Sequence, residues 1–132
     1  MEDHFAGILL AAAAAARRDG SEGIHPHHLL VGALAKDRTA SSRLFQLHVA
    51  DAFRREVDGL DRAASAHGHL PVSGVALEIL AAGFRGSGFS VRSAPAMLTK
   101  ALLLGLLSME PGRLALQAAG LDEDAVRRVA SE

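Results

Sequence analysis

Three histidines at the start of an apolar segment are the residues most suggestive of metal chemistry. His25, His27 and His28 surround Pro26, and neutral imidazole is the commonest protein ligand for transition metals. Proline favours the first position of a helix, so His27 and His28 should be consecutive helical residues. Consecutive side chains point about 100° apart around the axis, so these two cannot share one ion. We therefore expect His28 to be a core residue bonded to a neighbouring loop, with His25 and His27 at the surface.

Other reactive residue types lack the context that catalysis requires. Ser41 and Ser42 could be nucleophiles beside His48, but the sequence contains no nucleophile elbow. Lys36 and Lys100, the two lysines, lack the upstream glycines of a phosphate-binding P-loop. The chain has no cysteine, which excludes a thiol nucleophile and cysteine metal ligands. We expect no catalytic residue, no metal and no cofactor.

The composition predicts a single domain with a substantial core. The chain has 132 residues, of which 49% are hydrophobic, and a formal net charge of −1. A nucleic-acid or anionic-membrane partner would call for a basic excess, so neither is expected. No apolar run approaches the ~20 residues that span a bilayer. Glu2 and Asp3 precede the first apolar run where a signal peptide would be basic, so we expect a cytoplasmic protein.

Apolar spacing and helix-breaking residues predict eight helices and no strand. The second helix is apolar on all sides, so it should be central and buried. Ser73 should cap the fifth helix, and Gly83, Gly86 and Gly88 should fray its end. The expected helices cover about residues 2–18, 26–35, 39–47, 50–64, 95–107 and 111–119, with the fifth starting after Ser73 and the last starting at 122.

The eight expected helices form two related sets of four. Residues 100–106 resemble residues 28–34 at an offset of 72, and the order of breaks and caps also matches. We expect an all-α fold of two four-helix units with pseudo-twofold symmetry, in one domain over residues 1–132. The first repeat covers about residues 1–64, the linker residues 65–72, and the second repeat about residues 73–132.

One aligned pair breaks the repeat pattern. Lys100 stands where the first repeat has His28, yet lysine is rarely buried without a partner. We expect either that the Lys100 amine reaches the surface, or that the sixth helix is rotated or shifted relative to the second.

The repeat and two local motifs resemble the N-terminal domain of Clp unfoldases, closest to the ClpC type. The first motif is Ile24-His25-Pro26-His27-His28-Leu29-Leu30-Val31, with an eroded copy at residues 96–103. The second motif is the linker at residues 68–73. The resemblance covers essentially the whole chain. It implies an all-helical domain without activity of its own, which docks substrates and adaptors onto the unfoldase ring.

The resemblance also implies where ligands would bind. ClpC-type domains can bind phosphoarginine and certain cyclic peptide antibiotics. The acidic residue of the family motif is replaced by His27 and Thr99 in the two repeats, so a guanidinium loses its ionic partner at both positions. The positions that match the family's binding residues are Met1, Glu2, His27, Val72, Ser73 and Thr99.

We therefore expect a non-catalytic peptide- or protein-binding module that docks adaptors or substrates, or that modulates the Clp protease. Its partners would be Clp unfoldase or protease components, an adaptor or substrate protein, or a cyclic peptide. One alternative is a sequestration or resistance protein that binds a peptide natural product. A further alternative is a metal-dependent enzyme.

Overall fold

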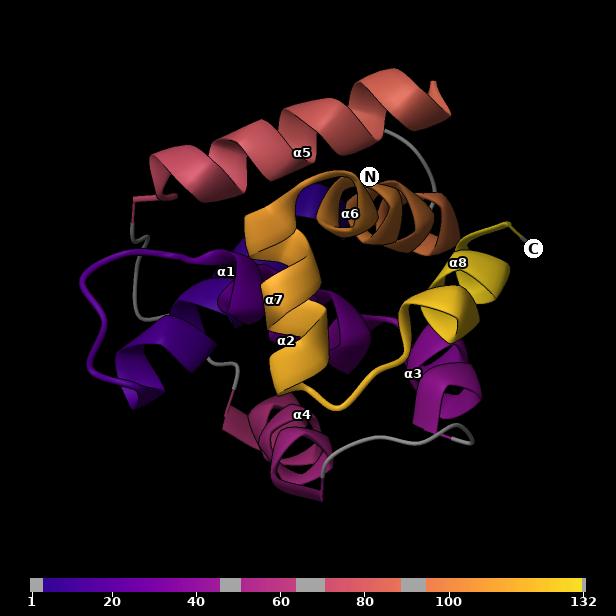
Figure 1. The fold of residues 1–132 in the computed structure, drawn as a ribbon. Coiled ribbons are helices and arrows are strands. Elements are labelled where there is room, and N and C mark those ends of the chain that lie inside the picture. Colours follow the sequence, from indigo (N-terminus) through magenta and orange to yellow (C-terminus); the bar gives the residue numbers. More distant parts are fainter. Residues whose placement is uncertain (1–3, 46–50, 64–70, 89–94, 132) are drawn as a thin grey trace.

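The computed structural model describes residues 4–45, 51–63, 71–88 and 95–131, and confirms the predicted all-α class over these residues (Figure 1). They contain eight helices and no strand beyond one isolated bridge. None of these helices is long and apolar enough to cross a membrane. The helices are α1 (His4–Arg18), α2 (Pro26–Lys36), α3 (Arg38–Phe45), α4 (Asp51–Ala63), α5 (Gly74–Ser87), α6 (Pro95–Ser108), α7 (Glu110–Ala118) and α8 (Glu123–Ser131).

Helix α2 is the buried central helix that its apolar pattern predicts. Residues 28–35 are all buried, including the polar His28. Helix α6 is nearly as buried and contacts α2 directly. Figure 1 shows α5 at the top and α4 at the bottom of the view, on opposite sides of this central pair. Buried residues from all eight helices belong to one hydrophobic cluster.

Each of the two central helices packs so closely against one neighbouring helix that their backbones are in contact. Helix α2 packs along α1, where a Cβ added to Gly32 would lie 2.7 Å from the backbone nitrogen of Ala12. Helix α6 packs along α5, where Gly83 and Gly105 face each other's helix with no room for a Cβ. Buried alanines on α1 permit the same close approach in the first pair. Small residues at these crossings therefore determine how closely the helices pack.

The ends of α5 follow local cap chemistry. The Ser73 hydroxyl accepts a hydrogen bond from the Ala76 N–H at 3.2 Å, which confirms the predicted N-cap. The expected fraying at Gly83 is wrong, because the helix continues to Ser87. It ends at Gly88, whose φ of 77° is the left-handed conformation that glycine adopts easily.

A short parallel bridge joins the segments that lead into α2 and α5. The Ile24 N–H donates to the Pro71 carbonyl at 2.8 Å, and the Ser73 N–H donates to the Ile24 carbonyl at 2.9 Å. The first turns of α2 and α5 therefore start side by side, although they are almost fifty residues apart in sequence.

Lys100 is not buried in the way its alignment with His28 would require. Lys100 is half-buried, whereas its neighbour Ala101 is buried. Gly105 packs against α5 as Gly32 packs against α1, and 105 − 32 is 73 rather than 72. Matching these two glycines would set Lys100 against His27 rather than against His28.

Candidate functional sites

His28 is a structural residue with both ring nitrogens engaged, as predicted. Its Nδ1 accepts a hydrogen bond from the His25 N–H at 3.0 Å, so this nitrogen carries no proton. In the neutral ring the proton is then on Nε2, which donates to Oδ2 of Asp19 at 2.8 Å. The buried imidazole thereby connects the start of α2 to the turn that follows α1.

His27 lies in the first turn of α2 and faces two carboxylates. Its Nε2 is 3.2 Å and 3.1 Å from the two carboxylate oxygens of Glu56 on α4. Its ring meets Phe53 edge-on, with the ring centroids 5.9 Å apart. His27 is half-buried rather than free at the surface, whereas His25 is exposed. Asp19, His27 and Glu56 can each offer one ligand atom, and these atoms lie within 4.8 Å of one another.

Sequence reasoning missed the two carboxylates of this cluster. Asp19 belongs to the segment that breaks the first helix, and Glu56 lies 29 residues beyond His27. No motif spacing connects these positions, because the packing of α2 against α4 alone brings Glu56 to His27. No local signal singled out Glu56, because α4 carries three other carboxylates, Asp51, Asp58 and Asp61.

Among the predicted binding residues that the structure describes, Thr99 lies apart from Val72 and Ser73. Met1 and Glu2 lie outside the described residues. Val72 and Ser73 are half-buried beside Ile24, near the start of α2 that carries His27. Helices α5 and α6 run antiparallel, with Gly83 against Ala101, so Ser73 is about twelve residues, or about 18 Å, along α5 from the part level with Thr99.

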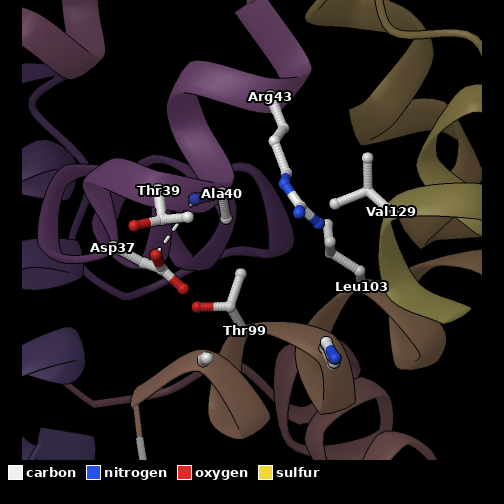
Figure 2. A pocket seen from close by; sticks show the side chains of 9 residues that line it. Asp37, Thr39, Ala40, Arg43, Thr99, Leu103 and Val129 are labelled. Carbon is white, nitrogen blue, oxygen red and sulfur yellow. Dashed lines mark hydrogen bonds between the residues drawn. The ribbon is translucent and has the colours of Figure 1, made fainter. Parts of the chain in front are cut away.

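Thr99 lines a small cavity elsewhere, at the end of α2 (Figure 2). The cavity holds about 60 Å³, which is room for a few water molecules. Small-molecule sites typically hold ~300–1,000 Å³. Figure 2 shows Thr99 directed towards Asp37, and Arg43 reaching from α3 towards Val129. Because Thr99 is only 1% exposed, its hydroxyl cannot meet a protein surface without rearrangement.

Ser73→Ala should lower the free energy of unfolding by about 1 kcal/mol, because the variant loses the side-chain acceptor for the Ala76 N–H. Ser73→Asp keeps an acceptor at the N-cap and should stay within about 0.5 kcal/mol of wild type. Urea denaturation followed by circular dichroism measures both. Equal stabilities for the two variants would show that the cap contributes nothing.

In the described part of the chain, polar side chains gather in two places: the Asp19–His27–Glu56 cluster and the cavity that Thr99 lines. A third feature, the bridged starts of α2 and α5, has exposed apolar side chains nearby. No protein-family model and no curated protein matches this sequence.

Proposed function

We propose that this chain is a non-catalytic protein-binding module of the Clp N-terminal type. It docks an adaptor or substrate protein for a cytoplasmic Clp unfoldase, or modulates that protease by competing for its partners. The strongest support for this proposal is that apolar side chains are exposed next to the bridge that joins the starts of α2 and α5. Val75 and Leu77, 40% and 54% exposed, lie in the first turn of α5, directly after Ser73.

The packing of the two halves supports the proposed double repeat. In the first half Gly32 contacts the backbone of Ile8 and Ala12, four residues apart on α1. In the second half Gly105 contacts the backbone of Ile79 and Gly83, also four residues apart on α5. The same glycine-mediated helix crossing in both halves is what two copies of one unit would produce.

The proposed docking surface wraps around the start of α5 and consists of Val72, Ser73, Val75 and Leu77, with Val75 and Leu77 on opposite sides of the buried Ala76. Ile24 is buried beneath it, and the backbone bridge from Ile24 holds the start of α5 in place. Burying one leucine or valine side chain contributes roughly 1.5–3 kcal/mol, so two such side chains can anchor a small interface. A surface that is ordered before binding also loses little entropy when a partner docks.

Leu77→Asp should weaken binding of the Clp partner at least tenfold, because it replaces the most exposed apolar side chain of the docking surface with a charge. An aspartate in the first turn of a helix suits the helix dipole, so the fold should not suffer. The matched control is Leu114→Asp on α7, where the leucine is 56% exposed and lies outside the docking surface. Surface plasmon resonance with the purified unfoldase and adaptors of the same cell measures both variants.

Two results would overturn the proposal. One is that no purified Clp unfoldase, protease or adaptor binds the wild-type chain. The other is that Leu77→Asp and Leu114→Asp weaken binding equally, because the docking surface would then have no special role. Tight binding of a cyclic peptide without any protein partner would instead favour the sequestration function.

A further inference from the structure

Three chain segments bring one nitrogen and two carboxylate ligands to the same place. Asp19 lies in the turn that follows α1, His27 in the first turn of α2, and Glu56 in the middle of α4. Their ligand atoms lie within 4.8 Å of one another. We propose that Asp19, His27 and Glu56 bind a divalent transition-metal ion, for which zinc is the best match. This inference does not depend on the proposed docking function.

The distances suit two ligands of one ion. Zinc bonds to histidine nitrogen and carboxylate oxygen are about 2.1 Å long, so tetrahedral ligands are separated by about 3.4 Å. His27 Nε2 lies 3.1 Å and 3.2 Å from the Glu56 oxygens, within a few tenths of an ångström of that separation. The Asp19 side chain is 46% exposed and can turn towards the ion without disturbing the core.

Residues behind the cluster hold its ligands in position. His28 donates from Nε2 to Oδ2 of Asp19, and its own Nδ1 is held by the His25 N–H. A carboxylate has several lone pairs, so Asp19 can accept this bond and still coordinate an ion. The ring of Phe53 packs against that of His27 and limits its rotation. Such supporting contacts are typical of metal sites, where they orient the ligands.

The ligand types select the class of ion. One imidazole and two carboxylates suit zinc, whose two positive charges the carboxylates would neutralise. Calcium takes six to eight oxygen ligands, and magnesium prefers oxygen in octahedral geometry, so both should bind weakly. The side chains of His27 and Glu56 are 32% and 20% exposed, so water or a partner's donor group can complete the coordination.

The competing explanation is that His27 and Glu56 simply form a hydrogen-bonded pair between α2 and α4. That pair explains the short contacts but does not require Asp19. Two substitutions separate the explanations. Asp19→Asn keeps an acceptor for His28, and Glu56→Gln keeps an acceptor for His27. Both variants preserve the hydrogen bonds while removing the charge that a metal ion needs.

Calorimetric titration of the metal-free protein with zinc chloride tests the proposal. We expect one zinc per chain, with affinity reduced at least tenfold in Asp19→Asn and in Glu56→Gln and unchanged in the control His25→Ala. Zinc should also raise the melting temperature of wild type but not of Glu56→Gln, because only a ligand of the folded state stabilises it. Circular dichroism confirms that each variant is folded.

Three outcomes would overturn the site. Wild type could bind no zinc, or the two variants could bind zinc as tightly as wild type. Calcium or magnesium could also bind as tightly as zinc, which would indicate attraction between charges rather than coordination.

Discussion

Gly83→Ala is expected to lower the free energy of unfolding by about 3 kcal/mol. A Cβ at residue 83 would overlap the backbone carbonyl of Ala101 on α6 and approach the Gly105 nitrogen to 3.3 Å. Backbone atoms of a helix cannot move aside as a flexible side chain can, so α5 and α6 must separate. Overpacking of this kind typically costs 1–3 kcal/mol. In a chain of this size the melting temperature should fall by roughly 10 °C.

The matched control lies in the same helix. Nothing lies within 4 Å of a Cβ built at Gly86, so Gly86→Ala should be neutral or slightly stabilising through higher helix propensity. Thermal denaturation of both variants, followed by circular dichroism, makes the comparison. Equal melting temperatures for Gly83→Ala and Gly86→Ala would contradict the close packing of α5 against α6.

His28→Ala is expected to cost about 2–4 kcal/mol of stability. The substitution opens a cavity at the start of the central helix and removes two hydrogen bonds, one to Asp19 and one from the His25 N–H. The bond to Asp19 connects α2 to the turn after α1, so its loss should also loosen that turn. Urea denaturation gives the free energy, and amide hydrogen exchange near Asp19 reports the local loosening.

A second substitution at His28 separates packing from hydrogen bonding, and a substitution at His4 is the control. His28→Leu restores most of the volume but neither hydrogen bond, so its stability should lie between wild type and His28→Ala. His4→Ala removes an exposed histidine at the start of α1 and should stay within about 0.5 kcal/mol of wild type. A His28→Leu protein as stable as wild type would show that the hydrogen bonds contribute nothing.

The structural role of His28 was predictable because it follows from one helix. Pro26 sets the helix start, and the apolar residues after His28 place it on the buried side. The cap at Ser73 was predictable for the same reason, since its partner Ala76 is three residues away. In each case the interacting groups are close in sequence or share one helical face.

The surroundings of His27 were not predictable in this way. Its partner Glu56 comes from another helix, and Asp19 comes from the end of a third. The relative positions of the predicted binding residues also could not be predicted from nearby residues in the sequence. Ser73 lies beside Ile24 through a bridge between distant segments, while Thr99 is buried at a separate cavity.

By itself, the sequence determined the helices, their caps and the burial of α2, because these depend on residues within a few positions of one another. Only the tertiary structure decided that Gly105 lies against Ile79 and Gly83, because this is a contact between two helices. The tertiary structure also decided the surroundings of the histidines at the start of α2. The burial of His28 could be predicted from its own helix, but only the packing of α2 against α4 placed carboxylates beside His27.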